Sequence, residues 1–290
     1  MLLDMIGRKI LVTGAGGMLG SVLIKKLNCE NIIGYGRNLD ITKPINIKNV
    51  LDNEKPHIII HTAAYTDVNG CELNSKKAYG VNAIGTRNLI RYCIENKTFF
   101  IYISSTGVYG STKNEAYTEF DDTIPTTVHH QSKLLAEKYI EKYLDKYLIL
   151  RTGWLYGGDN SHDKNFVFKI YLDSKEKDMI YADNTQIGNP TYINDLVKQI
   201  EVLLTNNQNG LFNCVNEALN ISRFDYVRKI IDFLNINCKV KIAPLGVFNR
   251  IAPVSKNESA VNYKLKNNGL NCMYDWEKAL WRYIKTNKFF

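Results

Sequence analysis

Residues 10–20 read Ile10-Leu11-Val12-Thr13-Gly14-Ala15-Gly16-Gly17-Met18-Leu19-Gly20, an apolar run followed by a glycine-rich turn and a helical pattern. In such a turn the first glycine permits the tight bend and the second lets the backbone approach a pyrophosphate. The third lets the helix pack closely on a sheet. The N–H groups at the helix start, with the positive end of the helix dipole, attract phosphate. The stretch therefore predicts a dinucleotide site formed by Gly14, Gly17, Met18 and Leu19.

Short apolar runs alternate with helical patterns through the rest of the N-terminal half. The expected strands lie at 9–12, 31–35, 57–62, 99–103 and 147–151, and the expected helices at 18–27, 78–95 and 131–143. Strands separated by helices indicate a parallel sheet, and apolar runs without alternation indicate strands covered on both faces. We predict an α/β fold with a Rossmann-like doubly wound parallel sheet, whose ligands lie beyond the carboxyl ends of its strands.

The pattern loosens after about residue 160, where polar loops appear. Further helices are expected at 195–204, 223–234 and 275–283. We predict a Rossmann domain over residues 1–160, to which later segments return. A smaller mixed α/β domain over 161–290 is expected to bind the substrate.

Composition excludes several classes of protein. The 290 residues are 45% hydrophobic, as in a globular protein, and no apolar run approaches the roughly 20 residues of a membrane helix. Six cysteines lack paired spacing and no histidine cluster accompanies them, so we expect no metal site. The net charge of +8 (37 minus 29) comes without a basic run interleaved with aromatics, so no nucleic-acid partner is expected. We expect a cytoplasmic protein without a membrane partner.

The choice of cofactor depends on the end of the second strand, where an acidic residue would bind the ribose hydroxyl of NAD. This chain has Gly34-Tyr35-Gly36-Arg37 there instead. Arg37 suits the 2′-phosphate of NADP through a charge-assisted contact. Asp40 lies close by and could serve the adenosine end. We predict NADP, with NAD as the alternative.

Several longer motifs then narrow the class. They are Leu39-Asp40-Ile41-Thr42, Ala63-Ala64-Tyr65-Thr66-Asp67-Val68, Val81-Asn82, Arg151-Thr152-Gly153-Trp154-Leu155-Tyr156 and Gly188-Asn189-Pro190-Thr191-Tyr192. Together with the glycine spacing they resemble the dTDP-4-dehydrorhamnose reductase family of extended short-chain dehydrogenases. The resemblance implies reduction of the 4-keto group of a nucleotide-linked deoxysugar with NAD(P)H, for surface polysaccharide synthesis. It also implies cofactor contacts from Ile41, Ala63, Ala64, Tyr65 and Asn82.

The active site of that family holds a serine or threonine and a Tyr-x-x-x-Lys motif. The phenol protonates the carbonyl oxygen, while the lysine lowers the phenol's pKa and holds the cofactor ribose. By resemblance, Ser105 takes the hydroxyl position after the strand at 99–103, where it would orient the carbonyl. Lys133 takes the lysine position and is expected to contact the cofactor as well.

The tyrosine position is occupied by His129, so the motif reads His-x-x-x-Lys. Three hypotheses follow. His129 donates the proton itself, since an imidazolium titrates near neutrality, although a nearby lysine would lower its pKa. Alternatively another group acts, such as His130, Tyr109 or water. In the third hypothesis the chain binds its ligands without fast chemistry, as a relative that serves as a regulatory subunit of methionine adenosyltransferase does.

The substrate contacts implied by the resemblance come mainly from the second half of the chain, where core packing is the competing interpretation of the aromatic residues. The family's tail arginine, which meets the diphosphate, is missing from residues 252–256, and Arg250 is its nearest substitute. The expected substrate contacts are Thr106, Trp154, Asn165, Gln186, Tyr192 and Arg250. The alternatives to a ketoreductase are an NAD-dependent nucleotide-sugar dehydrogenase or epimerase, and a nucleotide-binding regulatory subunit. The sequence does not decide between a monomer and a homodimer.

Overall fold

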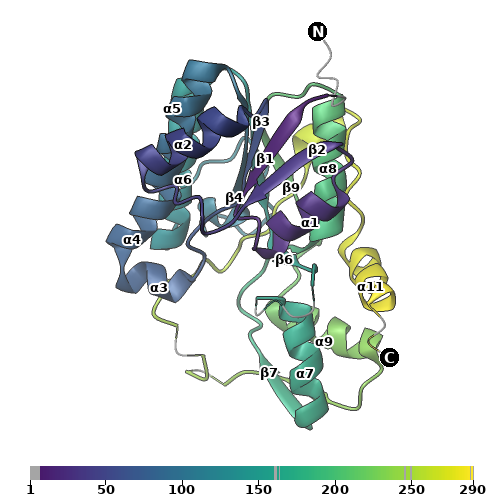
Figure 1. The fold of residues 1–290 in the computed structure, drawn as a ribbon. Helices are drawn as coiled ribbons and strands as arrows, with labels where there is room; N and C mark the ends of the chain where they lie inside the picture. The colour runs from purple at the N-terminus through teal and green to yellow at the C-terminus, as the bar shows by residue number, and fades with distance from the viewer. Residues whose placement is uncertain are drawn as a thin grey trace.

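A six-stranded parallel sheet forms the centre of the molecule in the computed structural model (Figure 1). The structure describes residues 7–159, 162, 164–244, 246–248, 250–287 and 289. The strand order is β2-β1-β3-β4-β5-β9. These strands are β1 (Lys9–Thr13), β2 (Asn31–Tyr35), β3 (Ile58–His61), β4 (Phe99–Ser105), β5 (Tyr147–Thr152) and β9 (Gly210–Cys214). The predicted doubly wound parallel sheet is therefore confirmed.

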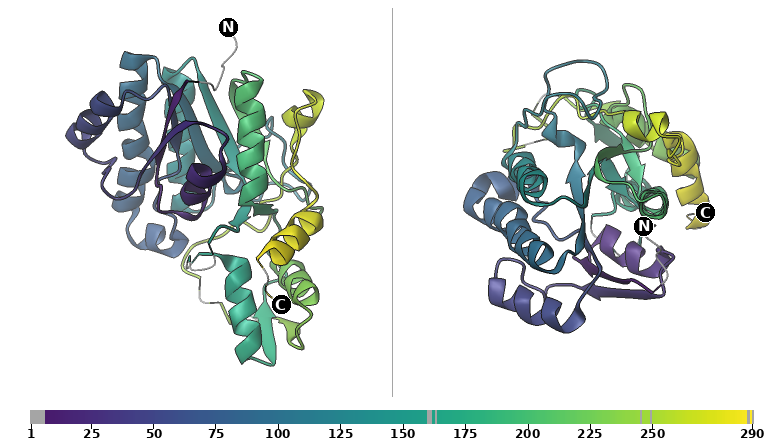
Figure 2. Two further views of the ribbon diagram at one scale, coloured as in Figure 1. Left: turned by 45° about the vertical axis from the view of Figure 1, so that its right-hand side comes forward. Right: turned by 90° about the horizontal axis from the view of Figure 1, so that it is seen from above.

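Helices cover both faces of this sheet (Figure 2). On one face α1 (Met18–Lys26) and α8 (Ile193–Thr205) pack against inward-facing residues such as Ile10 and Val12. On the other, α2 (Pro44–Glu54), α5 (Thr86–Asn96) and α6 (Val128–Tyr143) pack against residues such as Leu11. Consecutive residues of β1 thus face two different cores, which explains why its sequence is apolar throughout.

The chain changes direction along the sheet at β1. From β1 it passes to β2 on one side and then returns to β3 on the other. Such a switch point leaves a crevice beyond the carboxyl ends of the two central strands, because the connections leave in opposite directions. The glycine turn follows β1 directly, so it lies at this crevice.

A smaller part of the molecule lies beyond the carboxyl ends of the strands (Figure 1). It contains α7 (Phe166–Glu176), β7 (Met179–Ala182), α9 (Arg223–Leu234), β10 (Lys239–Ile242) and α11 (Trp276–Thr286) around one aromatic core. The strands β6 (Trp154–Tyr156) and β8 (Pro190–Tyr192) pair beneath the sheet, and α10 (Tyr263–Asn267) follows the last long loop. Helix α8 and strand β9 return to the main sheet between these elements.

The predicted helix at 78–95 is divided into three segments. It comprises the end of α4 (Ser75–Tyr79), a π-helical stretch η1 (Gly80–Gly85), and α5. The sequence analysis also missed α2, α3 (Val68–Leu73) and α7. Within the described part of the chain, no helix combines the length and apolar character needed to cross a membrane.

Candidate active site

The glycine turn has the close approaches that its sequence predicts. Gly14 has a φ of +69°, and a β-carbon there would lie 2.7 Å from the Ala63 backbone nitrogen. A β-carbon on Gly20 would lie 2.3 Å from the Gly14 oxygen, whereas one on Gly16 would meet nothing within 4 Å. Helix α1 starts at Met18 without a side-chain cap. The turn is therefore tightly packed on its inner side and open on its outer side, where N–H groups can receive a pyrophosphate.

The residues expected at the adenosine end surround the end of β2. Arg37 is exposed and makes no hydrogen bond or ion pair within the described residues, so its guanidinium is free to take a 2′-phosphate. Asp40 accepts hydrogen bonds from the backbone and hydroxyl of Thr42, at 3.0 and 2.6 Å, which lower the pKa of its carboxyl. Ile41 is buried against Gly85.

The loop after β3 forms the other wall of the crevice. Ala63 donates its N–H to Thr13 Oγ1 at 3.3 Å, which joins the loop to β1. The buried Asn82 clamps the backbone of Tyr65, since its Oδ1 accepts from Tyr65 N–H at 2.8 Å and its Nδ2 donates to Tyr65 O at 3.1 Å. Asn82 thus shapes the crevice by holding the loop that contains Ala64.

Ser105 ends β4 at the same edge of the sheet. Its Oγ accepts a hydrogen bond from the Gly107 N–H at 3.2 Å, in the short helix η2 (Thr106–Val108). A serine hydroxyl carries one hydrogen, which this contact leaves available for a carbonyl. Thr106 follows and is buried.

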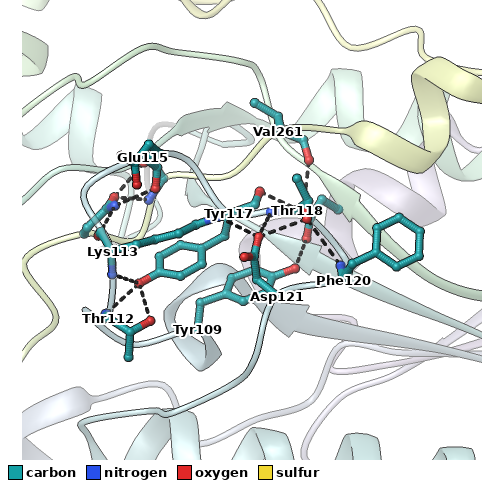
Figure 3. Close-up of polar contacts among 12 residues, drawn as sticks. Tyr109, Thr112, Lys113, Glu115, Tyr117, Thr118, Phe120, Asp121 and Val261 are labelled. Atoms are coloured by element: carbon teal, nitrogen blue, oxygen red, sulfur yellow. Dashed lines mark hydrogen bonds and ion pairs between the residues drawn. The ribbon is translucent and has the colours of Figure 1, made fainter.

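The segment after Ser105 is fixed by stacked tyrosines (Figure 3). The rings of Tyr109 and Tyr117 lie parallel with centroids 4.8 Å apart. The Tyr117 hydroxyl accepts from the Thr112 N–H at 2.8 Å, and its backbone pairs with Ser259 and Val261. Tyr109 is fully buried and donates to Asn213 Oδ1 at 2.8 Å. Tyr109 is thus part of the support of the turn, and its role as an alternative proton donor stays a prediction that this burial and hydrogen bond do not favour.

Lys133 reaches the edge of the sheet from the second turn of α6. Its Nζ donates to Ile103 O at 2.8 Å and lies 5.0 Å from the Tyr102 ring centroid. Burial lowers the pKa of the ammonium to about 8, while the Glu137 carboxylate opposes this shift. One of its three hydrogens is engaged, so the others can reach a bound ligand.

His129 is buried in the first turn of α6, and its ring is anchored on one side. Nδ1 lies 3.1 Å from Tyr65 O and 3.9 Å from Cys71 Sγ. Because a carbonyl oxygen can only accept, Nδ1 carries the hydrogen, and Nε2 is the atom that gains or loses a proton. Burial, followed by the charges of His130 and Lys133, lowers the pKa of His129 well below 6.5.

His130 lies under the η2 turn. Its Nδ1 contacts Thr127 Oγ1 at 3.0 Å, and that hydroxyl also caps the start of α6 by accepting the His130 N–H. A β-carbon on Gly107 would lie 2.2 Å from His130 Cε1, so the ring packs directly on the Gly107 backbone. His130 therefore supports the turn from beneath.

A buried ionic network that the sequence analysis missed lies below Lys133. Glu137 pairs with Arg151 at 2.7 Å and accepts a hydrogen bond from Ser104. Arg151 lies 4.6 Å from the Tyr109 ring centroid. Glu137 lies one helical turn after Lys133, and this i, i+4 spacing is the feature of the sequence that could have identified the network. The network places a negative charge near the ammonium and joins β4, β5 and α6.

Apart from Thr106, which is buried in η2, the predicted substrate contacts divide into two groups. Trp154, Gln186 and Arg250 lie together. Arg250 donates to Gln186 Oε1 at 3.3 Å, and the guanidinium of Arg223 contacts both Gln186 and the Trp154 ring. Asn165 and Tyr192 belong to the interior instead. Asn165 caps α7 and donates to the Tyr283 hydroxyl at 2.7 Å, while Tyr192 stacks on Tyr156. Substrate contact by these two residues stays a prediction that their packing does not favour.

A switch-point glycine turn, with Ser105 at the carboxyl end of β4 and Lys133 in the second turn of α6, defines a dinucleotide-dependent oxidoreductase of the short-chain dehydrogenase type. The family model described as "RmlD substrate binding domain" matches residues 8–289. The chain belongs to the dTDP-4-dehydrorhamnose reductase family, whose members are NADPH-dependent oxidoreductases acting on nucleotide sugars.

Relatives of known name match most of the chain. A dTDP-4-dehydrorhamnose reductase of Aggregatibacter actinomycetemcomitans is 31% identical, over 77% of this chain and 78% of its own. The spore coat polysaccharide biosynthesis protein SpsK of Bacillus subtilis is 26% identical, over 96% and 97%. The solved dTDP-4-dehydrorhamnose reductase of Bacillus anthracis, in complex with NADP, is 32% identical over 96% and 99%, with a TM-score of 0.91.

Proposed function

We propose that this protein reduces the 4-keto group of a nucleotide-linked deoxysugar with NADPH, and that His129 replaces the usual tyrosine as the proton donor. The observation that carries the proposal is the anchored imidazole. Its Nδ1 is held by Tyr65 O, so Nε2 alone exchanges protons. When the protonated ring of His129 gives up the proton on Nε2, it returns to one neutral tautomer with its hydrogen on Nδ1. This behaviour suits a general acid.

The bound cofactor would supply hydride to the keto carbon. Ser105 donates its free hydroxyl hydrogen to the keto oxygen and so orients the carbonyl. Lys133 keeps a positive charge near the oxygen on which negative charge develops, and its remaining hydrogens hold the cofactor ribose. His129 delivers the proton from Nε2 to that oxygen.

The cofactor proposal rests on the open outer side of the glycine turn and on Arg37. The uncapped start of α1 suits the pyrophosphate that NADH and NADPH share. The guanidinium of Arg37, which has no ion pair among the described residues, suits a further phosphate at the end of β2. Arg37 therefore favours NADPH over NADH, because only NADPH carries that additional phosphate.

The biological setting is proposed from relatives. The Bacillus subtilis relative is named for spore coat polysaccharide biosynthesis. We infer that the product enters a surface polysaccharide, that the enzyme works in the cytoplasm, and that a homodimer is its candidate assembly.

The test mixes the protein with NADPH and freshly prepared 4-keto nucleotide sugars that differ in their base. We expect the absorbance of reduced nicotinamide to fall with at least one sugar. Binding of both ligands without oxidation for any sugar would refute the reductase and favour a regulatory subunit. His129→Ala and Lys133→Met variants, compared with the exposed Lys138→Met, separate loss of chemistry from loss of folding.

A further inference from the structure

Arg223, the first residue of α9, was not singled out by the sequence and contacts the substrate side of the molecule. Its guanidinium carbon lies 3.4 Å from the ring centroid of Trp154 and 5.5 Å from that of Phe166. Its Nε donates to Gln186 Oε1 at 3.5 Å. The guanidinium thus covers the Trp154 ring, which was expected to meet the ligand directly.

The charge of Arg223 is not neutralised by an ion pair with any described residue. Its neighbour Arg250 is paired with Asp183 at 3.2 Å. The nearby Glu258 uses its Oε2 to accept a hydrogen bond from Trp154 Nε1 at 2.9 Å. Burial lowers the pKa of Arg223 to about 10, so the group remains charged at neutral pH. The Glu258 and Asp183 carboxylates oppose this shift in the pKa of Arg223 through their charge, but neither forms an ion pair with it among the described contacts. The guanidinium can therefore still bind the negative charge of a ligand.

The position of Arg223 relative to the reacting groups fits the substrate. Thr152 pairs with Ser105 across β5 and β4, and Trp154 stands two residues further on. Trp154, on which Arg223 stacks, therefore follows the strand next to that of Ser105, at the same edge of the sheet. The glycine turn follows β1, which lies three strand spacings from β5, or about 14 Å. This separation places the Trp154 segment, over which Arg223 lies, on the substrate side of the crevice and away from the cofactor's pyrophosphate.

We propose that Arg223 holds the diphosphate of the nucleotide-linked sugar, while Arg250 is engaged by Asp183. This inference rests on the proposed function, because it assumes a nucleotide-sugar substrate. The planar guanidinium can donate two parallel hydrogen bonds to phosphate oxygens. Stacking on Trp154 holds the plane in position, so little conformational entropy is lost when the diphosphate binds.

The test is the binding of nucleoside diphosphates and the matching nucleosides, measured by calorimetry with NADPH saturating the cofactor site. dTDP, UDP, GDP and CDP are the probes. For the base that binds best, Arg223→Gln should weaken diphosphate binding about 10- to 100-fold and nucleoside binding little. Arg223→Lys should be intermediate, because it keeps the charge and loses the planar fork. Arg228→Gln is the control, since Arg228 is exposed on the same helix with a 3.5 Å ion pair to Asp225.

Three results would overturn the proposal. They are equal binding by Arg223→Gln and the unaltered protein, equal losses for diphosphate and nucleoside, and the absence of binding by any of the four diphosphates. Thermal unfolding of each variant shows whether a loss reflects folding. Because no hydride transfer is measured, diphosphate binding through Arg223 without NADPH oxidation would refute the reductase and leave this inference intact.

Discussion

The reduction rate should fall steadily as pH rises through neutrality, because His129 must be protonated to act as the acid. Burial first, and then the charges of His130 and Lys133, hold the pKa of His129 well below 6.5. Above that pKa the imidazolium fraction drops tenfold for each pH unit. Between pH 6.5 and 8, kcat/KM should therefore decrease about 30-fold.

The assay follows the absorbance of reduced nicotinamide at several pH values and constant ionic strength, and it compares the protein with a His129→Tyr variant. A phenol has a reference pKa of about 10, so the variant should keep its acid form and lose rate only near pH 8, where Lys133 begins to deprotonate. Circular dichroism at each pH excludes unfolding as the cause.

A flat profile for the unaltered protein between pH 6.5 and 8 would refute His129 as the donor. A decrease confined to the region near pH 8 would indicate Lys133 instead, because burial lowers the pKa of that ammonium to about 8. The pH at which the rate changes thus distinguishes His129 from Lys133. For both groups the rate falls as pH rises, because each acts in its protonated form.

Three further predictions concern single side chains. Arg37→Ala should raise the Kd for NADPH about tenfold or more and leave the Kd for NADH nearly unchanged, and equal losses in the two titrations would contradict the 2′-phosphate assignment. Gly14→Ala should lower the free energy of unfolding in urea by at least about 1–2 kcal/mol, because φ is +69° and the new carbon meets the Ala63 backbone; unaltered stability would contradict this close packing. Tyr109→Phe should cost about 1 kcal/mol of stability through the lost bond to Asn213, and a large fall in kcat with normal folding would restore Tyr109 as a donor.

The sheet and the cofactor crevice were predictable because their signals are local. The glycines at 14, 17 and 20 recur every third residue from the end of a strand-length apolar run into a helical pattern. The π-helical stretch, which contains Asn82, was not predicted. That side chain bonds to the Tyr65 backbone and to Ser132, and both contacts come from other parts of the chain.

The chemistry of the site was only partly visible in the sequence. The His-x-x-x-Lys spacing identified His129 and Lys133, but the tautomer of His129 depends on Tyr65 O, 64 residues away. Asn165 and Tyr192 lie close to the expected site in the chain, yet their side chains are engaged in the core. Arg223 carried no sequence signal, because its importance arises from the Trp154 ring beneath it.

Transfer of deuterium from labelled NADPH tests the central claim most directly. Reduced cofactor labelled at the transferring position is incubated with a 4-keto nucleotide sugar, and the product is examined by mass spectrometry and NMR. We expect one deuterium at C4 of the sugar and a hydroxyl in place of the ketone. An unlabelled product, or unreacted sugar from a protein that binds both ligands, would contradict it.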